Sequence, residues 1–305
     1  MNILITGSSG LIGSKLKTSL QESGHTVFCL LHNTNNSTPE KDLTWSIKNN
    51  YVRIDQLAEI DAVVHLAGSN IAKPWTKNHK KSIYESRVNG TELLINHLKS
   101  QPNRIKHFIS TSAIGYYPNP TTSTCDESAT SGKGFLSDVC VDWEKAAQPI
   151  QSDQTKLSIV RVGLVLAMEG GLLPVAGLTR KLGIVPNTGS KQNIWSWIHL
   201  TDLVEIFKQL ATGELRSGTY NAVSPNPCEQ GTFAKSLIQA TKSKGQRILP
   251  LSITPSIPSA LLRLILGERS VLPLTSQHVQ NTGLEEQSFK YKYPEIEIAL
   301  EDLIA

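Results

Sequence analysis

The stretch that decides the fold is Met1–Gly13, which reads MNILITGSSGLIG. An apolar run over residues 2–5 predicts a buried strand, and residues 14–22 carry Leu16 and Leu20 at helical spacing. The glycine-rich turn therefore joins a strand to a helix. In that context a G-x-x-G-x-x-G turn binds dinucleotide phosphates, whereas elsewhere the same residue types form ordinary surface turns.

The three glycines of this turn have separate physical roles. Gly7 is expected to need backbone angles that a Cβ penalises, Gly10 to let the main chain approach a ligand, and Gly13 to let the helix pack on the strand. The N–H groups that begin the helix, at Leu11 and Ile12, lack partners within it and point out at the positive end of its dipole. This arrangement predicts a pyrophosphate site.

Composition places the chain among ordinary globular proteins. It has 305 residues, of which 39% are hydrophobic and 18% charged, and a net charge of +4. The basic cluster Lys77–Lys81 is more typical of a solvated helix face than of a nucleic-acid site. No apolar run approaches the roughly 20 residues that span a bilayer. We therefore expect a small-molecule substrate, no nucleic-acid or membrane partner, and a monomer or homodimer.

The four cysteines show neither metal-ligand spacing nor a disulfide framework: Cys29, Cys125, Cys140 and Cys228. We expect no metal, and a reducing compartment is the simpler interpretation. The first predicted strand starts at residue 2, which leaves no room for a signal or transit peptide. These features favour the cytoplasm, unless a leader has already been removed.

The end of the second predicted strand, residues 26–31, indicates which dinucleotide binds. An Asp or Glu about 20 residues beyond the glycines accepts the ribose hydroxyls of NAD, whereas a neutral or cationic residue leaves room for the 2′-phosphate of NADP. Here the strand ends in Leu31, and His32 and Asn33–Asn36 follow, so no carboxylate is present. We expect NADP(H) beside Leu31 and His32, with His32 either a phosphate contact or a plain loop residue.

Two further elements carry candidate cofactor contacts. Residues 61–68 predict a strand that ends in small residues, so that an adenosine can lie against the backbone at Leu66, Ala67 and Gly68. The alternative for Ala67 and Gly68 is an ordinary strand-to-loop turn. Arg87 lies in a helix predicted over residues 80–99, where it is either a partner for phosphate and hydroxyl oxygens or a surface residue.

The remaining pattern alternates strands with helices. Strands are predicted over residues 43–46, 107–112 and 157–166, a connecting helix or loop over 51–60, and helices over 203–210, 230–241, 258–266 and 295–304. The run at 157–166 is apolar enough to be buried on both faces.

Four motifs in the first half of the chain occur together. They are TGxxGxxG at residues 6–13, HLAG at 65–68, SRxNxT at 86–91, and the serine-rich strand that runs into Gly115-Tyr116-Tyr117. Jointly they resemble the extended short-chain dehydrogenase/reductases. More narrowly, they are similar to the atypical epimerase-family branch of nucleoside-diphosphate-sugar epimerase-like proteins. The similarity continues to Leu264–Glu268, which resembles the small C-terminal domain of unknown function in that branch, and so covers nearly the whole chain.

The resemblance implies an α/β fold: a Rossmann-type doubly wound parallel sheet with a smaller mixed α+β C-terminal lobe. We expect an NADP-binding domain over residues 1–168, to which a helix at about 201–212 returns, and a substrate or C-terminal lobe over 169–305. In members of the family the end of the last domain strand lies beside the nicotinamide. Gly163 and Val165 are therefore expected backbone contacts.

The resemblance also indicates that part of the usual catalytic apparatus is missing. Extended reductases carry a Tyr-x-x-x-Lys pair, in which the lysine lowers the tyrosine pKa. The corresponding positions hold Leu136 and Cys140, and Cys140 has few positive neighbours in sequence that would favour a thiolate. Ser112 matches the serine that orients the substrate. Tyr117 is the candidate proton donor, with core packing or substrate stacking as alternatives.

Two functions follow from these observations. The first is an NADP(H)-dependent oxidoreductase or epimerase that acts on a small hydroxyl, carbonyl or nucleotide-sugar-like compound. The second is a catalytically weak or inactive NADP(H)-binding regulatory protein. We favour the enzyme, because three tryptophans are available for an apolar cleft: Trp75, Trp195 and Trp197. His199 is either a general acid or a structural residue beside a helix start.

Overall fold

The computed structural model describes residues 1–32, 43–121, 123–171, 173–180, 182–243 and 252–304. The chain forms two compact units. Unit 1 consists of Met1–Tyr116, Lys133–Arg161 and Val204–Tyr220, and unit 2 of Tyr117–Gly132, Val162–Leu203 and Asn221–Ala305. The boundary expected after residue 168 differs from this division, because 117–132 and 162–168 lie in unit 2. Asn33–Asn36, used above to choose the cofactor, lie outside the described residues.

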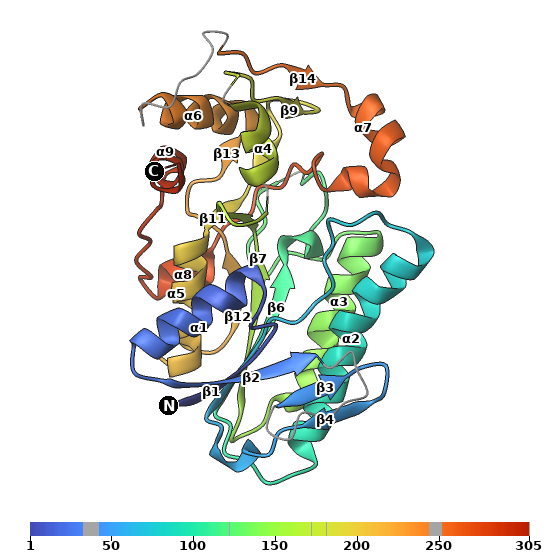
Figure 1. Cartoon of the computed structure of the whole chain (residues 1–305), viewed down its shortest axis with the longest axis vertical. Coiled ribbons are helices and arrows are strands. Elements are labelled where there is room, and N and C mark those ends of the chain that lie inside the picture. The colour runs from blue at the N-terminus through green and yellow to red at the C-terminus, as the bar shows by residue number, and fades with distance from the viewer. Residues whose placement is uncertain (33–42, 122, 172, 181, 244–251, 305) are drawn as a thin grey trace. The chain divides into compact units, whose positions relative to one another are not determined.

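An eight-stranded sheet, most of which belongs to unit 1, has the strand order β12-β7-β6-β5-β1-β2-β3-β4 (Figure 1). The strand bounds are β1 (Asn2–Thr6), β2 (Thr26–His32), β3 (Thr44–Ser46), β4 (Tyr51–Arg53), β5 (Ala62–His65), β6 (His107–Ala113), β7 (Lys156–Val162) and β12 (Thr219–Ala222). The pairs β1–β2, β1–β5, β5–β6 and β2–β3 are parallel, and β3–β4 is antiparallel. The predicted Rossmann-type α/β fold is confirmed.

The winding of the sheet reverses at β1. The chain adds β2 and β3 on one side of β1 and then crosses to place β5 and β6 on the other side. Thr6, the last residue of β1, pairs with Leu30 of β2 and with His65 of β5. The carboxyl ends of these three strands therefore meet at a topological switch point, where ligands bind in open α/β sheets.

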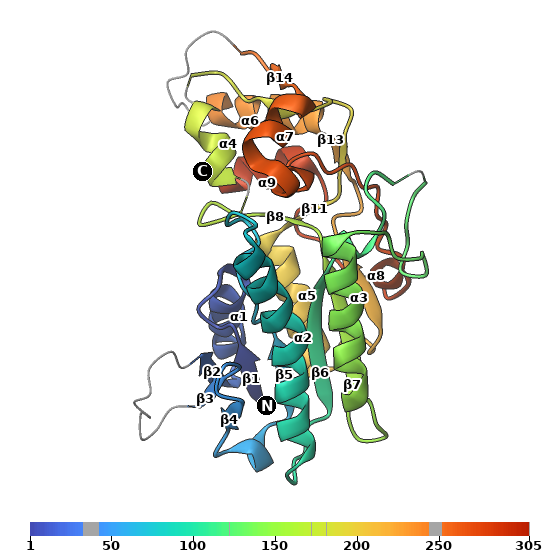
Figure 2. The same cartoon turned by 90° about the vertical axis from the view of Figure 1, so that its right-hand side faces the viewer.

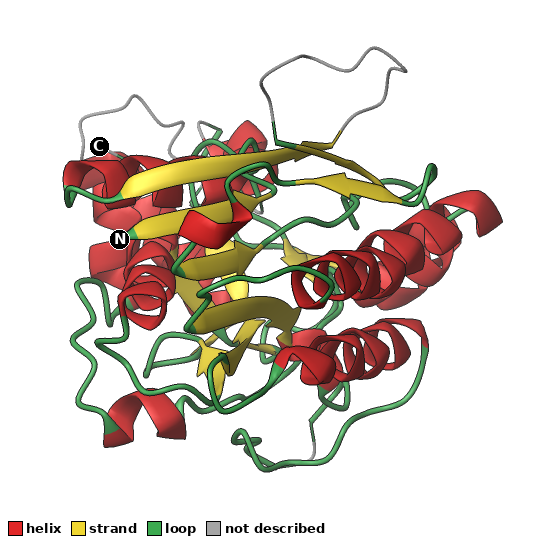
Figure 3. Ribbon diagram, turned by 90° about the horizontal axis from the view of Figure 1, so that it is seen from below, coloured by secondary structure: helices red, strands yellow, loops and turns green. Residues whose placement is uncertain are grey.

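Helices cover both faces of this sheet. Their bounds are α1 (Leu11–Glu22), α2 (Lys77–Lys99), α3 (Phe135–Ala147) and α5 (Leu200–Thr212). Helices α2 and α3 lie side by side on one face, and α1 and residues 204–212 of α5 cover the other (Figures 1, 2 and 3). This layering buries β1, β5 and β7 on both sides along most of their length, and their residues form near-continuous apolar runs.

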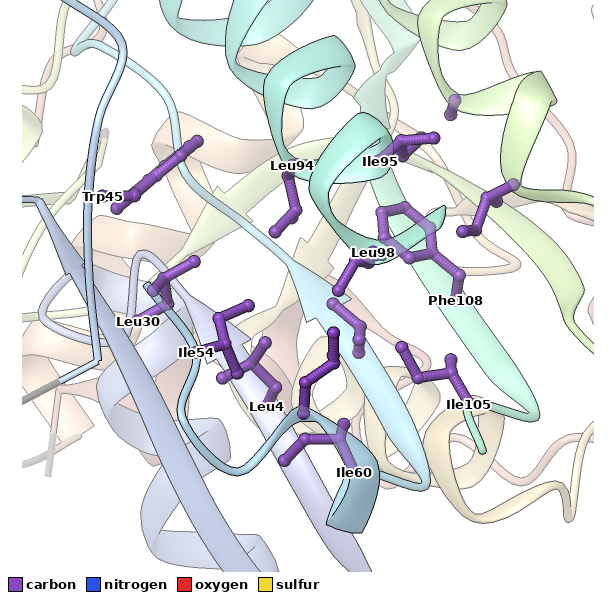
Figure 4. Packing of buried hydrophobic residues seen from close by; sticks show 14 of the residues in the cluster. Leu4, Leu30, Trp45, Ile54, Ile60, Leu94, Ile95, Leu98, Ile105 and Phe108 are labelled. Atoms are coloured by element: carbon purple, nitrogen blue, oxygen red, sulfur yellow. The ribbon is translucent and has the colours of Figure 1, made fainter. Parts of the chain in front are cut away.

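The core of unit 1 lies between the sheet and α2 (Figure 4). Leu4 and Phe108 of the sheet pack there with Leu94 and Leu98 of α2, all four with no exposed surface. The helix begins after Thr76, whose hydroxyl accepts the His79 N–H. Its buried residues recur at helical spacing, so the face of α2 that meets the sheet is fixed along its length.

Unit 2 is a smaller mixed assembly of short strands and helices. Its strands are β8 (Leu164–Leu166), β9 (Asn187–Thr188), β10 (Ile194–Trp195), β11 (Trp197–His199), β13 (Cys228–Glu229) and β14 (Ser256–Ile257), which form the pairs β8–β11, β9–β14 and β10–β13. Its helices are α4 (Leu173–Arg180), α6 (Gln230–Ser243), α7 (Ser259–Leu266), α8 (Thr282–Glu286) and α9 (Ile296–Leu303). Trp195 and Trp197 lie in its apolar core with Phe233 of α6 and Leu300 of α9.

Two sequence predictions of secondary structure were partly wrong. The helix or loop expected over residues 51–60 is correct for Leu57–Glu59, which form a short 3₁₀ helix, but Tyr51–Arg53 form β4, which pairs antiparallel with β3. The single strand expected over 157–166 is two strands, β7 and β8, separated by Gly163. At Gly163 the chain leaves the large sheet, and β8 then pairs with β11. A Cβ at Gly163 would lie 2.7 Å from the Ser196 carbonyl oxygen, so only glycine fits this crossing point.

Over the described residues, no helix is long and apolar enough to cross a membrane. In the same part of the chain, no three His, Cys, Asp or Glu side chains are grouped so that they could hold a metal ion.

Candidate functional site

A pocket of about 760 Å³ opens in unit 1 at the switch point of the sheet. Its floor comes from the residues that follow parallel strands: Gly7–Ser9 after β1, Leu30–His32 at the end of β2, Ile47 and Lys48 after β3, and Ala67–Ser69 after β5. Five of the predicted cofactor contacts are among the residues that line it: Gly7, Leu31, His32, Ala67 and Gly68.

The glycine turn packs too tightly for side chains at two positions. Gly7 has φ +70°, and a Cβ there would lie 2.9 Å from the Ala67 nitrogen. A Cβ on Gly13 would lie 2.3 Å from the Gly7 carbonyl oxygen, well inside contact distance. The Gly10 N–H closes the turn by donating to that same oxygen at 3.0 Å. The sequence therefore needs glycine here for backbone packing between β1, β5 and α1.

The start of α1 offers backbone donors to an anion. Gly10 is the N-cap of the helix and provides no side-chain oxygen to cap it. The N–H groups of Leu11, Ile12 and Gly13 belong to the first turn of α1, where N–H groups have no carbonyl acceptor within the helix. Of the glycine turn, only Gly7, Ser8 and Ser9 line the pocket. Residues 10–13 would therefore contribute to anion binding through the backbone N–H groups at the start of α1.

A chain of buried hydrogen bonds joins the ends of β1 and β5 to α2. Thr6 Oγ1 accepts the N–H groups of Leu66 and Ala67, both at 3.2 Å, so its proton must go to His65 Nδ1 at 2.8 Å. His65 therefore carries its proton on Nε2, which donates to Thr91 Oγ1 at 3.0 Å. Burial lowers the pKa of His65 to about 4, which keeps the ring neutral.

Arg87 holds the loop after β5 from behind. Its guanidinium donates to the carbonyl oxygens of Ser69 and Ile83 at 3.0 and 3.3 Å. A Cβ on Gly68 would lie 3.1 Å from the Arg87 Cζ, so the two residues fit each other closely. Arg87 is not among the described residues that line the pocket. In this structure Arg87 fixes the Gly68 backbone and does not contact the pocket.

One face of α2 closes the pocket opposite the strands. Ser86 Oγ accepts the Ser69 N–H at 2.9 Å, and Ser82 Oγ lies 2.8 Å from Ser69 Oγ. Lys81 and Glu85 form an ion pair at 3.6 Å on the same face. These residues line the pocket together with Asn89. The wall is therefore rich in hydroxyl and amide groups, as a ribose or phosphate ligand requires.

Ser112 is a buried hydroxyl held by an ion pair. Its Oγ donates to Glu144 Oε1 at 2.7 Å, and the same carboxylate accepts Nε and a terminal N–H of Arg161, both at 2.8 Å. The Arg161 guanidinium also stacks 3.6 Å from the centre of the Tyr116 ring. All four residues belong to unit 1. The Ser112 proton is thus directed at Glu144, which leaves its oxygen lone pairs for other partners.

Leu136 and Cys140 lie on α3, behind Gly115. A Cβ on Gly115 would meet Leu136 Cβ at 3.6 Å and Cys140 Sγ at 3.8 Å. Burial is the main reason that the pKa of the Cys140 thiol is raised to about 11, and the nearby Glu144 carboxylate raises it further. Cys140 is therefore a protonated, enclosed thiol at neutral pH, as expected of an inert cysteine.

Tyr117 is a buried residue of unit 2 with 2% of its surface exposed. Its hydroxyl donates to Asn221 Oδ1 at 2.7 Å, and Gln277 Nε2 donates to its carbonyl oxygen at 3.2 Å. This environment is that of a packed core tyrosine.

Gly163, Val165 and His199 also lie in unit 2. The Gly163 N–H donates to the Ala222 carbonyl oxygen at 3.1 Å, and Val165 of β8 pairs with Ile198 of β11. His199 Nδ1 accepts the Thr201 N–H at 3.1 Å, and burial lowers the pKa of its ring to about 4. The alternative of a structural histidine at a helix start matches this geometry.

Several residues of the pocket were missed in the sequence. Trp45 and Lys48 line it from the β3 side, Ser69 from the loop after β5, and Ser82 and Ser86 from α2. The serines at 82 and 86 repeat with an i, i+4 spacing on one helix face, which was a usable signal. Lys48 carried no such signal in the sequence. Only the turn between β3 and the antiparallel strand β4 brings Lys48 to the edge of the pocket, and β4 was not predicted.

Comparison with known proteins agrees with this geometry. Residues 3–135 match the NAD dependent epimerase/dehydratase family, and residues 257–303 match a domain of unknown function called DUF1731. An epimerase family protein of Staphylococcus aureus, SAB0724c, is 32% identical over 305 residues, which cover 99% of this chain and 98% of that protein.

Two solved structures resemble the chain over its whole length. The human epimerase family protein SDR39U1 (isoform 2), solved with NADPH, has a TM-score of 0.84 and 28% identity, covering 100% of this chain and 99% of that one. A nucleoside-diphosphate sugar epimerase of Corynebacterium glutamicum has a TM-score of 0.77 and 28% identity, and the match covers 58% of its length.

The fold and the switch-point pocket define an NAD(P)-binding protein of the short-chain dehydrogenase/reductase type. Within that class, the chain belongs to the epimerase family, and its residues 257–303 match DUF1731.

Proposed function

We propose that the protein binds NADP(H) in the switch-point pocket and is an oxidoreductase or epimerase acting on a small hydroxyl, carbonyl or nucleotide-sugar-like compound. The observation that carries the proposal is the glycine turn, where Cβ atoms at Gly7 and Gly13 would collide with backbone that borders the pocket. Such close packing leaves main-chain N–H groups as the surface offered to a pyrophosphate.

The described residues fit a dinucleotide at each part of the pocket. The backbone of Gly7, Gly10, Leu11, Ile12 and Gly13 would hold the pyrophosphate. The adenosine would lie against the ends of β2 and β5, which carry Leu31, His32, Leu66, Ala67 and Gly68. Arg87 would act through the Gly68 backbone that it supports. Gly163 and Val165 stay proposed neighbours of the nicotinamide.

NADP(H) is favoured over NAD(H) by the charges at the adenosine end. β2 ends in His32, and within the described part of the chain Glu85 is the single carboxylate that lines the pocket. Glu85 is paired with Lys81 and lies on α2, opposite the strand ends. An NAD-type carboxylate acceptor at the end of β2 is therefore replaced by a ring that tolerates a phosphate. The human relative solved with NADPH supports the same choice.

The chain's own residues would orient the substrate and handle its proton. When bound, NADP(H) supplies a two-electron redox couple at its nicotinamide. Ser112 Oγ, whose proton points at Glu144, would accept a hydrogen bond from a substrate hydroxyl. Tyr117 stays the proposed proton donor, and its hydroxyl would have to leave Asn221 to act.

A two-stage assay tests the proposal. Cofactor binding is first established with NADPH by its fluorescence on titration with protein. The loaded protein is then mixed with a panel of aldehydes, ketones and nucleotide-linked keto sugars under single-turnover conditions, and the near-ultraviolet absorbance of NADPH is followed. Substrate-dependent loss of absorbance, slowed at least tenfold by Ser112→Ala, supports the enzyme. Confirmed binding with no loss of NADPH for any compound contradicts the oxidoreductase, and turnover that Ser112→Ala leaves unchanged contradicts the role of Ser112.

The second candidate, an NADP(H)-binding regulatory protein, is favoured by one observation. The positions that correspond to the usual Tyr-x-x-x-Lys pair hold Leu136 and the buried, protonated thiol of Cys140. Neither group can transfer a proton at neutral pH. Unchanged NADPH during prolonged incubation with substrates, together with an NADPH-dependent change in protease sensitivity of unit 2, would select this function.

A further inference from the structure

We propose that Lys48 recognises the 2′-phosphate of NADP(H) and is the described residue that distinguishes NADP(H) from NAD(H). The inference rests on the proposed function, because it assumes that the pocket takes an adenine dinucleotide. It assigns a specificity role to a residue of the turn between β3 and β4.

The strand register places Lys48 beside the end of β2. In the parallel pair β2–β3, Leu31 lies opposite Thr44 and His32 opposite Trp45. β3 ends at Ser46, one residue past that pair, and Lys48 follows two residues later. Lys48 and His32 both line the pocket. Since the adenine ribose lies at the end of the second strand in dinucleotide folds, its 2′-oxygen would come near Lys48.

The backbone that carries Lys48 is held from both sides. Ser46 Oγ accepts the Asn49 N–H at 3.3 Å, and the Asn50 N–H donates to the Ile47 carbonyl oxygen at 3.2 Å. These bonds close a tight turn around Lys48. The preceding Trp45 has 2% of its surface exposed and packs against α2 at Gly90. The Lys48 backbone is therefore fixed at the pocket edge, and its exposed side chain can reach a ligand.

The charges around the pocket leave Lys48 available. Lys81, the other lysine of the lining, is engaged by Glu85 at 3.6 Å. Among the described residues Lys48 has no ion-pair partner. A phosphate monoester carries close to two negative charges at neutral pH, and a ribose hydroxyl carries none. A hydrogen bond between an ammonium and a phosphate is about twice as strong as a neutral one, so Lys48 would favour the phosphorylated dinucleotide.

Calorimetry of the full-length chain with two adenosine ligands tests the proposal without any reaction. Adenosine 2′,5′-bisphosphate and adenosine 5′-monophosphate differ only in the 2′-phosphate. For Lys48→Gln we expect the affinity for the bisphosphate to fall about tenfold. The affinity for the monophosphate should stay within about twofold. The preference of the unsubstituted protein for the bisphosphate over the monophosphate should also weaken as the salt concentration is raised from low to physiological levels.

Two matched variants serve as controls, and a third compares His32 with Lys48. Lys81→Gln removes the other pocket lysine, and Lys99→Gln removes an equal charge from the last turn of α2. The ratio of the two affinities should stay within about twofold in both controls. His32→Gln removes the imidazole at the end of β2 and should change this ratio less than Lys48→Gln does. Thermal unfolding checks that each variant is folded.

The outcomes separate this inference from the function on which it rests. The assignment of Lys48 is overturned if Lys48→Gln still prefers the bisphosphate over the monophosphate. It is also overturned if this preference is lost instead in His32→Gln or Lys81→Gln. Both outcomes leave the proposed NADP(H) site intact. An equal loss of both ligands in Lys48→Gln also overturns the assignment. If the unsubstituted protein binds neither ligand nor NADPH, the proposed function fails, and the role of Lys48 fails with it.

Discussion

Arg161 and Glu144 form a bidentate ion pair, with Nε to Oε1 and a terminal nitrogen to Oε2 both at 2.8 Å. The side chains are 6% and 13% exposed, so water does little to screen them. The pair joins β7 to α3, and Ser112 of β6 donates to the same carboxylate. It therefore fixes the one candidate catalytic hydroxyl that unit 1 contains.

We predict that Glu144→Ala lowers the free energy of unfolding by roughly 3–5 kcal/mol, because it leaves the Arg161 guanidinium buried without its carboxylate. Asp142→Asn, which removes an exposed carboxylate of the same helix from Lys145 at 3.9 Å, should cost less than about 1 kcal/mol. Urea unfolding of the two variants measures both values. Equal losses would contradict the role assigned to the Arg161–Glu144 pair.

The neutral ring of His65 predicts a loss of stability in mild acid. Its pKa is about 4 in the folded chain and 6.5 when free, so between these values the unfolded state binds more protons. Stability is full above about pH 6.5 and falls as the pH approaches 4, by roughly 3 kcal/mol from this residue. His199 acts in the same direction.

Urea unfolding across this pH range tests the contribution of each histidine. Glutamine does not titrate, so the stability of His65→Gln should depend less on pH than that of the unsubstituted protein. His199→Gln should remove a separate part of the pH dependence of stability, and the double variant should remove both parts. A pH profile that is unchanged in His65→Gln would contradict the buried neutral ring.

The glycine turn predicts unequal effects of adding one methyl group. Gly13→Ala places a Cβ 2.3 Å from the Gly7 oxygen, and should cost about 2 kcal/mol or more of stability and most of the dinucleotide affinity. Gly10→Ala meets the same oxygen at 3.3 Å with ordinary backbone angles, so its stability cost should stay below about 1 kcal/mol. Thermal unfolding and NADPH titration of both variants check this. A Gly10→Ala variant as damaged as Gly13→Ala would argue against the packing described here.

The cysteines predict a selective pattern of thiol labelling. Burial raises the pKa of Cys140 to about 11 and that of Cys228 to about 12. In the native protein at pH 8 we expect Cys29, which is partly exposed, to react at least tenfold faster than Cys140. Mass spectrometry after brief labelling identifies the sites, and unfolding should make all four reactive. Rapid labelling of Cys140 in the native state would reopen a catalytic role for it.

Much of unit 1 was predictable because its signals are local. The Met1–Gly13 stretch, the strand before Ala67 and Gly68 and the helix that carries Arg87 are each set by spacing within a few residues. The first and third elements form where they were expected, and the strand forms but ends at His65, three residues earlier than predicted. The break at Gly163 was not predictable, because it depends on the Ser196 backbone 33 residues later in the chain.

The candidate site was predictable only where backbone defines it. The glycines follow from a motif, but the neutral His65 ring depends on Thr6 and Thr91, which are brought together by sheet register and α2. In the same way, Ser112 could be aligned with a family position, but its donation to Glu144 needs β6 and α3 in place. Side chains from separate elements leave no periodic trace in a single sequence.

The most direct test of the account is calorimetric titration of the full-length protein with NADPH and NADH. We predict saturable binding of one NADPH per chain, tighter than NADH, with most of the affinity lost in Gly13→Ala. The absence of heat with both dinucleotides, under conditions in which thermal unfolding shows a folded protein, would contradict its central claim that the amino-terminal turn holds a phosphorylated dinucleotide.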